Sequence, residues 1–462
     1  MSNKSKNIEM ITGDPKKAIV KLALPMMLSM LLIMLYNIAD SIWVAGLGAD
    51  ALAAIGFITP LFLVLVGLGN GIGAGANSLI ARFIGAENHK QANNAALHGI
   101  LLSIIVSVIF TVLIEVFMVP ILQFMGAGDT IQYGMDYSYV IFGFLFIFVY
   151  SGVASAIFRS EGDMRRATIA IAITAILNII LDPIFIYKLN LGIAGAAWAT
   201  VISAIISCAI MSYWIWGKKD LYLDLSLKNF NYQGSLMVDT LQVAIPSTLE
   251  TIVFSALAIL INNMLVLASG TDAVAVYTAS MRIVQLAMIP LIGLGTAVLT
   301  VSGVAFGAHN HENLKTAHSY SIKLGFLISA GIGIIMVVFS SQIASVFSYT
   351  AASASLSPEI ATAISVLSLF VLVVPHGIMS SMMFQGVGKG IYSLLITLLR
   401  SLILETVFAY IFCFIFGWGI TGIYAGVVFG CFVGGTIGYI WAKFFIRKFK
   451  QISIKKYTPQ KD

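Results

Sequence analysis

The chain has 462 residues, of which 59% are apolar and only 10% are charged. Soluble globular proteins carry about 25% charged residues, so this composition excludes a soluble protein and indicates one that crosses a membrane many times. The net charge of +6 could suggest nucleic-acid binding, but the positions of the charges follow membrane topology, and we expect no nucleic-acid partner.

Apolar runs separated by charged or glycine-rich breaks predict about twelve membrane-spanning helices, since one span takes about 20 residues. We place them near 18–46, 51–81, 93–119, 132–158, 166–187, 193–216, 239–268, 273–305, 316–341, 359–385, 391–416 and 420–446. The predicted fold is therefore an all-α integral membrane protein with twelve transmembrane helices.

Lysine and arginine lie almost entirely in the loops on one side of these spans, and the loops on the other side hold only Lys188. Because cytoplasmic loops carry the excess of basic residues, and an even number of spans returns the chain to its starting side, both termini are predicted to be cytoplasmic. We expect a multi-pass protein of the cell membrane that acts as a monomer.

The two halves of the chain resemble each other. FIGAENH at 83–89 matches AFGAHNH at 305–311, FRSEG at 158–162 matches FQGVG at 384–388, and GIAG at 192–195 matches GITG at 419–422. Ordered matches at a nearly constant offset indicate duplication of a six-helix unit, an arrangement typical of transporters. We predict two pseudo-symmetric lobes, 1–216 and 239–462 with its basic cytoplasmic tail, joined by a cytoplasmic linker at 217–238.

The first span carries a carboxylate, Asp40, past its middle. An Asp at the centre of a spanning helix costs about 2.5–3.5 kcal/mol on insertion scales, and such a group usually faces a polar interior on an ion or proton path. Tyr36 lies one turn earlier on the same helical face, with Asn37 beside it. Pro25 frees a backbone carbonyl and is the predicted hinge of this span.

A second buried carboxylate, Asp182, lies one helical turn after Asn178 and directly before Pro183. Asp182 could instead cap the outer end of span five, but two acids in one lobe, each with an amide neighbour, are better explained as one site. A low-dielectric site favours the protonated carboxylate, which suits proton coupling. Alternatively, these oxygens could hold Na⁺, a hard cation, with help from Thr200 and Tyr137. We leave H⁺ and Na⁺ open, and expect no other cofactor.

The second lobe has a different set of polar residues inside its predicted spans. Candidate cavity residues are Glu250, Arg282, Gln285, His376 and Glu405. Arg282 and one of the glutamates could alternatively form a structural ion pair. Aligning Pro25 with Pro246 puts Ile261 opposite Asp40, so the lobes share architecture and not chemistry.

Two further patterns have less specific meanings. GLGNGIGAG at 67–75 looks like a phosphate-binding loop but lies inside a span, where small residues more often allow close helix packing. Met27 and Met30 on the first span would give a soft, adaptable lining for apolar ligands.

These motifs resemble those of the multidrug and toxic compound extrusion (MATE) transporters over nearly the whole chain. The similarity lies in GDPKKAIVKLALPMM, LYNIADSIWVAGLG, IFRSEGDMRRATIAIAITAILNIILDPIFIY, SMRIVQLAMIPLIGLG and MMFQGVGKG. The sequence looks closest to the DinF-like branch, especially its archaeal members. That resemblance implies a coupling site at Asp40, Asn178 and Asp182, with Tyr36, Thr200 and Tyr137 in matching places. Ser155 stands where close relatives have a polar Asn, and the helix-ten acid of the NorM branch has no counterpart in VLVVPHG.

The resemblance also implies a central cavity and export of amphipathic, often cationic drugs or metabolites, driven by inward H⁺ or Na⁺. We therefore predict a secondary active antiporter in contact with membrane lipids, and not an enzyme, since no convincing nucleophile–base set or metal-ligand set is present. The alternative is a lipid or oligosaccharide flippase of the same superfamily. A passive channel would never support uphill transport.

Overall fold

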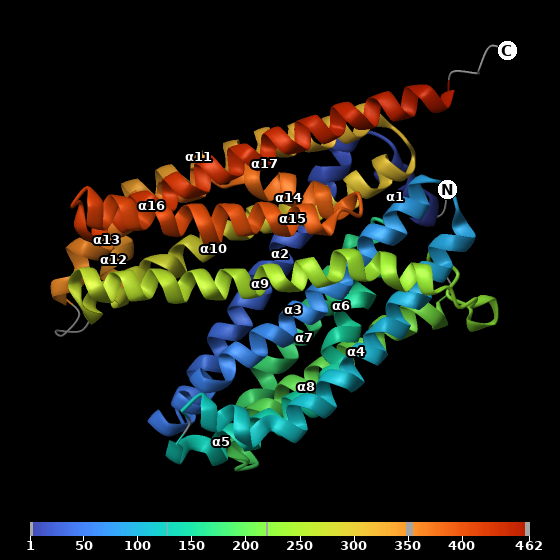
Figure 1. Cartoon of the computed structure of the whole chain (residues 1–462). Coiled ribbons are helices and arrows are strands. Elements are labelled where there is room, and N and C mark those ends of the chain that lie inside the picture. The colour runs from blue at the N-terminus through green and yellow to red at the C-terminus, as the bar shows by residue number, and fades with distance from the viewer. Residues whose placement is uncertain (1–2, 127, 219, 348–353, 458–462) are drawn as a thin grey trace. The chain divides into compact units, whose positions relative to one another are not determined.

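The computed structural model describes residues 3–126, 128–218, 220–347 and 354–457, and helices are its regular elements in this part of the chain (Figure 1). Ten of them are long and apolar enough to cross a membrane, and the number rises to twelve when each of two bent helix pairs counts as one span. The predicted all-α fold with twelve spans is confirmed.

The chain forms two compact units. Unit 1 is Met1–Gly13 with Leu24–Thr248, and unit 2 is Asp14–Ala23 with Leu249–Asp462. Helices α2 (Pro15–Ala45) and α9 (Gly234–Ser269) each contribute residues to both units. The linker at 217–238 and the start of α9 belong to unit 1.

The remaining elements of unit 1 are α1 (Asn3–Thr12), α3 (Ala49–Gly85), α4 (His89–Phe124), η1 (Gly128–Thr130), α5 (Ile131–Gly143), α6 (Leu145–Ser160), α7 (Met164–Pro183), η2 (Ile184–Lys188), α8 (Gly192–Ser212), η3 (Tyr213–Gly217) and η4 (Leu227–Asn229).

The glycines of the 67–75 motif lie inside α3, where the backbones of neighbouring helices come close. A Cβ at Gly71 would stand 2.6 Å from the Ala244 carbonyl oxygen, and one at Gly75 would stand 2.4 Å from that of Thr240. The close-packing interpretation of this motif is correct.

The remaining elements of unit 2 are α10 (Thr271–Gly307), α11 (His311–Val338), α12 (Ser340–Phe347), η5 (Ala354–Leu356), α13 (Ser357–Val373), α14 (Pro375–Gly386), α15 (Gly390–Thr397), η6 (Leu398–Glu405), α16 (Thr406–Tyr410), η7 (Ile411–Ile415) and α17 (Gly419–Tyr457). The buried core of unit 2 is mostly aliphatic and includes Ile261 of α9, which is fully buried. This confirms that the residue matching Asp40 in the second half is a packing residue.

Two corresponding spans are bent, one in each half. The α5–α6 pair bends by 46° and the α13–α14 pair by 42°. The second bend lies directly before Pro375, which lacks a backbone N–H for the helical ladder. The first bend has no proline. There the Thr111 hydroxyl donates to the Phe142 carbonyl at 3.0 Å, so a side chain replaces a backbone donor at the break, a recognised cause of helix kinks.

The duplication seen in the sequence also appears in the backbone. Glu87 has φ of 55°, and His309, its counterpart in the second half, has φ of 52°. Further positive-φ pairs at matched positions are Gly48 with Gly270, Gly162 with Gly388, Asn190 with Gly417, and Gly192 with Gly419. Left-handed backbone is uncommon outside glycine, so its recurrence at matched turns shows that the two halves use the same connections.

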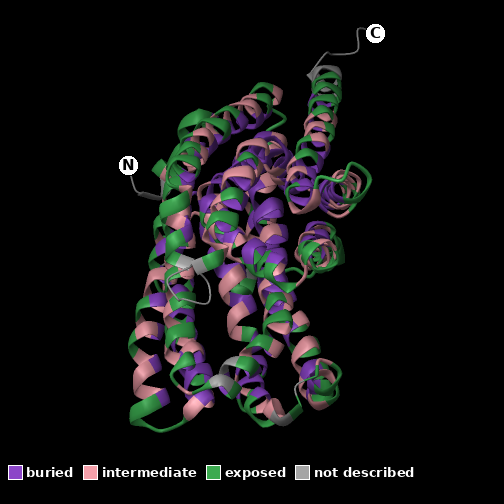
Figure 2. Cartoon of the chain, turned by 90° about the vertical axis from the view of Figure 1, so that its left-hand side faces the viewer, coloured by how far each residue is buried: buried purple, intermediate pink, exposed green. Residues whose placement is uncertain are grey.

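The outer faces of the helices are apolar and exposed, as lipid contact requires. On α4, Val108, Val112 and Val116 form a stripe at every fourth residue, and each is more than half exposed. Similar stripes of exposed residues run along one side of many helices, with buried residues on the other side (Figure 2).

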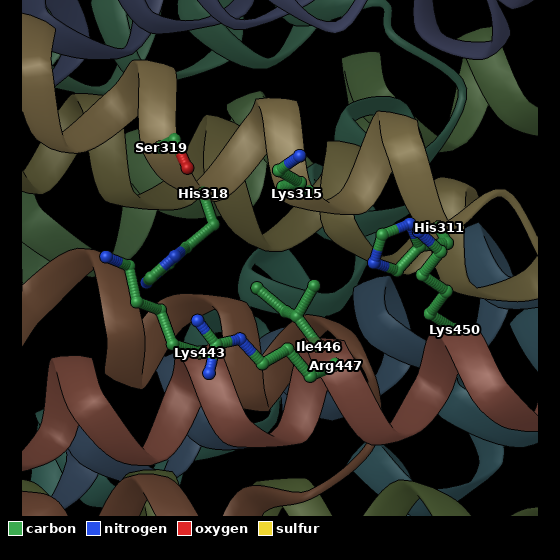
Figure 3. A pocket seen from close by; sticks show the side chains of 8 residues that line it. All are labelled: His311, Lys315, His318, Ser319, Lys443, Ile446, Arg447 and Lys450. Carbon is green, nitrogen blue, oxygen red and sulfur yellow. The ribbon is translucent and has the colours of Figure 1, made fainter.

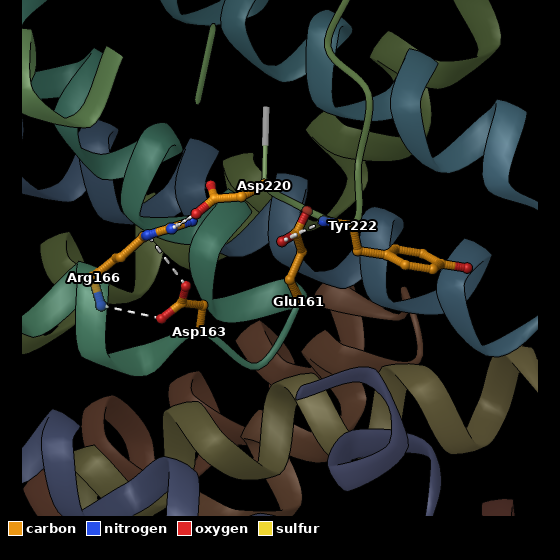
Figure 4. Close-up of polar contacts among 5 residues, drawn as sticks. All are labelled: Glu161, Asp163, Arg166, Asp220 and Tyr222. Atoms are coloured by element: carbon orange, nitrogen blue, oxygen red, sulfur yellow. Dashed lines mark hydrogen bonds and ion pairs between the residues drawn. The ribbon is translucent and has the colours of Figure 1, made fainter. Parts of the chain in front are cut away.

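The linker is attached to unit 1 by a buried carboxylate. Glu161 accepts hydrogen bonds from the backbone N–H groups of Tyr222 at 3.2 Å and Leu223 at 2.7 Å. Beside it, Arg166 pairs with Asp163 and with Asp220 of the linker (Figure 4). These contacts fix residues 220–223 of the linker to unit 1.

Candidate functional site

The Asn178–Asp182 pair forms a buried polar contact between two helices of unit 1. Both side chains lie on α7 and are at most 1% exposed. The Asn178 amide donates to Asp182 Oδ1 and to the Thr200 hydroxyl oxygen of α8, both at 3.1 Å. The helix continues past Asp182 into η2, so the alternative that Asp182 caps a helix end is wrong.

Asp40 of α2 lies within electrostatic reach of this pair. Its charge acts on Asp182, on Tyr36 one turn earlier in α2, and on Tyr137 of α5. Tyr137 also interacts with Asp182 and is buried. The structure thus brings the predicted N-lobe residues of α2, α5 and α7 together, with Thr200 of α8 beside them.

Three oxygen atoms in this cluster are buried without a hydrogen-bond donor. They are Asp40 Oδ1, Asn178 Oδ1 and Asp182 Oδ2. Buried polar atoms are normally satisfied, and each exception calls for an explanation such as an unseen ion or water. These three oxygen atoms can each accept a further hydrogen bond or coordinate a cation, which suits a bound proton, water or small cation.

The predicted hinge at Pro25 is held by α7. The Thr168 hydroxyl donates to the Pro25 carbonyl at 3.0 Å, and the Ser29 hydroxyl, 3.0 Å from that carbonyl, also donates to Thr168 Oγ1 at 3.0 Å. The helix that carries Asp182 therefore also contacts the proline turn of the helix that carries Asp40. Sequence reasoning missed Ser29 and Thr168, because single hydroxyl residues in apolar helices give no distinctive pattern.

The other candidate residues of the first lobe are spread over two helices. Asn37 is exposed on α2, and Met27 and Met30 are half-buried there. Ser155 is buried on α6, where its hydroxyl lies 3.8 Å from the Met211 sulfur. Its polar group is thus in contact with α8.

Glu250 forms a compact buried network in unit 2. The Ser393 hydroxyl donates to Glu250 Oε1 at 2.6 Å. The Gln385 amide lies 3.3 and 3.4 Å from the two carboxylate oxygens and 3.1 Å from Ser393 Oγ. Gln385 and Ser393 were not predicted, although Gln385 lies in the repeated motif at 384–388.

A second buried cluster of unit 2 surrounds Arg400. Its guanidinium interacts electrostatically with Glu250 and Glu405, but its Nε and Nη1 atoms and Glu405 Oε1 lack hydrogen-bond partners. His376 lies nearby, with Nε2 at 3.2 Å from the Thr436 hydroxyl oxygen. The arginine that interacts with the buried glutamates of unit 2 is therefore Arg400, and not Arg282 as expected from the sequence.

Two expectations for α10 need correction. Arg282 and Gln285 are exposed on α10, beside the exposed Leu286. Arg282 forms no ion pair within the described residues, so neither its expected burial nor its pairing with a glutamate holds. Arginine in an apolar sequence looks buried, but the exposed face of α10 accommodates it.

Comparison with known proteins places most of the chain in one family, because the MatE family model matches residues 25–184 and 246–411. The probable multidrug resistance protein NorM of Thermotoga maritima is 29% identical over 343 residues, covering 72% of each protein. The FAD transporter of Shewanella oneidensis is 26% identical over 367 residues, covering 78% of each.

A solved structure is similar over nearly the full length. It is a transporter of the MOP superfamily from Pyrococcus furiosus, described as having a binding pocket of reverse polarity that suggests a different function. It is 37% identical, has a TM-score of 0.93, and the match covers 97% of this chain and 99% of that one.

Proposed function

The chain belongs to the MatE family of multidrug transporters, and we propose that it is a secondary active antiporter that exports amphipathic, often cationic compounds in exchange for H⁺ or Na⁺. The family is one of transporters and not of enzymes. In this proposal the protein works as a monomer in the cell membrane, with both termini in the cytoplasm.

The observation that carries the proposal is the set of unpartnered buried oxygens on Asp40, Asn178 and Asp182. Leaving a buried acceptor unsatisfied costs about 1–3 kcal/mol, and more for a charged group. A cation that binds these oxygens recovers that energy, so its binding favours the conformation in which they can reach the cation. Such a preference is what couples an ion gradient to a conformational change.

The contact at Pro25 offers a route from the site to helix α2. Cation binding changes the charge on Asp40 and the hydrogen bonds of Asp182. Because Thr168 ties the Pro25 carbonyl to α7, a shift of α7 relative to α2 is transmitted to the proline turn. Drug release would follow from the resulting rearrangement of α2.

Both H⁺ and Na⁺ fit the proposal. In the part of the chain that the structure describes, no group of three or more His, Cys, Asp or Glu is arranged for a metal ion. A bound Na⁺ would therefore need the Asn178 and Thr200 oxygens in addition to the two carboxylates, whereas a proton needs only a carboxylate.

The proposal is tested by Asp40→Asn and Asp182→Asn in drug-sensitive cells. Each change keeps the shape but removes the charge that a coupling ion neutralises, so we expect drug resistance and efflux to be lost while the amount of protein in the membrane is unchanged. The matched control is Asp136→Asn, at an exposed acid of α5 bonded to Gln132, which should keep full efflux. Normal efflux by the Asp40 variant would overturn the assignment, and movement of lipid or oligosaccharide without drug export would favour the flippase.

A further inference from the structure

Unit 2 contains a basic groove between helices α11 and α17, with a volume of about 370 Å³. The side chains of Lys315 and His318 enter it from α11, and those of Lys443, Arg447 and Lys450 enter from α17 (Figure 3). On α11 the lining residues His311, Lys315 and His318 follow the spacing i, i+4, i+7, and on α17 residues 443, 447 and 450 follow the same spacing. Each helix therefore presents one basic stripe to the groove.

The charge of the groove is strongly positive. Glu312 pairs with His311 at 3.3 Å and with Lys315 at 3.7 Å, and is itself exposed. Among the residues described, no carboxylate lies at ion-pair distance from Lys443, Arg447 or Lys450. Three cations of α17 thus remain available for an external anion.

One wall of the groove is held in place by buried contacts. His318 is 1% exposed, and its Nε2 lies 3.0 Å from the Ser380 hydroxyl oxygen. Its ring stacks on Tyr439 at 5.7 Å, and the Lys443 ammonium lies 4.5 Å from the centre of the same Tyr439 ring. Lys443 is therefore positioned beside His318 and does not extend freely into solvent.

In the first half of the chain, the surface of α4 that corresponds to the α11 wall of the groove is covered by the linker. In the alignment of FIGAENH with AFGAHNH, His89 and Asn93 of α4 correspond to His311 and Lys315. The linker lies against α4 at this point, since the Tyr222 ring is 4.1 Å from the His89 ring and the Asp224 N–H donates to the Asn93 side chain at 3.0 Å. In the second half, α17 itself lines this position and is helical through to Tyr457.

The surroundings favour a membrane lipid as the occupant. Ile440 and Phe444 of α17 are 46% and 62% exposed and adjoin Lys443 along the helix, so apolar chains have a surface beside the cations. Basic pockets between helices at the membrane surface bind anionic headgroups, and arginine suits phosphate geometry. We propose that the α11–α17 groove binds the phosphate group of an anionic membrane lipid, with the acyl chains along Ile440 and Phe444.

The test measures lipid binding by native mass spectrometry. The purified full-length protein is mixed with phosphatidylglycerol, phosphatidylcholine or inorganic phosphate, and the bound adducts are detected. We expect phosphatidylglycerol adducts on the wild type and a loss of affinity of about tenfold or more in the double variant Lys443→Gln with Arg447→Gln. The matched control Lys448→Gln removes one charge from the same part of α17 outside the groove lining, and should bind like the wild type. The charge-preserving pair Lys443→Arg with Arg447→Lys should restore binding, which separates lost charge from misfolding.

Equal binding by the double variant and the wild type would overturn the site. Equal retention of phosphatidylcholine and phosphatidylglycerol would overturn its preference for anionic lipids. Displacement of the lipid by millimolar inorganic phosphate at equal efficiency would show a soluble anion as the ligand and contradict the lipid assignment.

Discussion

At the scale of single residues, the buried polar side chains inside these spans differ in their hydrogen bonding. Some accept hydrogen bonds from neighbouring side chains, and others keep an oxygen atom without a donor. The Glu250 carboxylate receives Ser393 and Gln385, whereas Asp40, Asn178 and Asp182 each keep one unpartnered oxygen. The first arrangement stabilises a folded helix contact, and the second is suited to binding an ion. Unit 2 also has an unpartnered carboxylate oxygen, on Glu405, but the buried cation Arg400 acts on that carboxylate, so we propose the coupling site in unit 1.

Ser393→Ala tests the structural side of this contrast. The change removes the hydroxyl that donates to Glu250 at 2.6 Å and leaves a buried carboxylate poorly satisfied, so we expect a loss of stability of about 1–3 kcal/mol. Thermal unfolding in detergent micelles measures it. Ser365→Ala, which removes only a bond to the Ala361 carbonyl of its own helix, should change the unfolding temperature little. Equal stability of the two variants would contradict the assigned role of Ser393.

At the scale of helices, close contacts between small residues and hydroxyl groups position the site. The α3 glycines let neighbouring backbones approach, and the Ser29–Thr168 pair joins α2 to α7 at Pro25. Packing of this kind is the main source of helix association in a membrane, where the hydrophobic effect between helices is absent. Two substitutions test these contacts separately.

Gly75→Ala should destabilise the protein, because the new Cβ would stand 2.4 Å from the Thr240 carbonyl oxygen and force two backbones apart. Overpacking of this kind costs about 1–3 kcal/mol, readable as a lower unfolding temperature. The control is Gly56→Ala in the same helix, where a Cβ meets nothing within 4 Å. It should leave stability unchanged or raise it by up to about 1 kcal/mol through helix propensity. If both variants unfold alike, α3 does not depend on close packing at Gly75.

Thr168→Val should loosen the hold of α7 on the proline turn of α2. The variant keeps the side-chain shape but loses the donor to the Pro25 carbonyl and the acceptor for Ser29. We expect a stability loss of about 1–2 kcal/mol together with slower drug export in vesicles. Thr174→Val on the same helix removes a bond to the carbonyl of Ala170 and should export normally. Unchanged export in the Thr168 variant would rule out this contact as the link to α2.

The helices show how far sequence reasoning reaches. The spans follow from runs of apolar residues, and the pairing of Asn178 with Asp182 follows from helical spacing. Other features depend on contacts that no local pattern encodes. The bend at 143–145 lies where Thr111 of another helix donates to a backbone carbonyl. The exposure of Arg282 depends on which face of α10 packs inward. The grouping of Asp40 with Asp182 was inferred from their chemistry, and its support in the structure is the electrostatic effect of Asp40 on Asp182.

At the scale of the whole chain, the two halves share their arrangement of helices and turns but differ in the polar residues that these helices carry. When the halves are aligned through Pro25 with Pro246 and through GIAG with GITG, the positions matching Asp40, Asp182 and Thr200 hold Ile261, Ala409 and Val427. All three are apolar and belong to the buried core of unit 2. The position matching Asn178 holds Glu405, which is buried with one unpartnered oxygen. The second half therefore has the same kinds of helices and turns but lacks most of the residues of the site.

The proposed coupling is tested most directly by transport in proteoliposomes, with a pH gradient and a sodium gradient imposed separately on the wild type and on Asp40→Asn. We predict that one of the two gradients drives uphill movement of an amphipathic cation in the wild type, and that neither does so in the variant, although the variant reconstitutes equally well. Uphill transport by Asp40→Asn at the wild-type rate, or downhill flux in the wild type that ignores both gradients, would contradict cation coupling at the Asp40–Asp182 site.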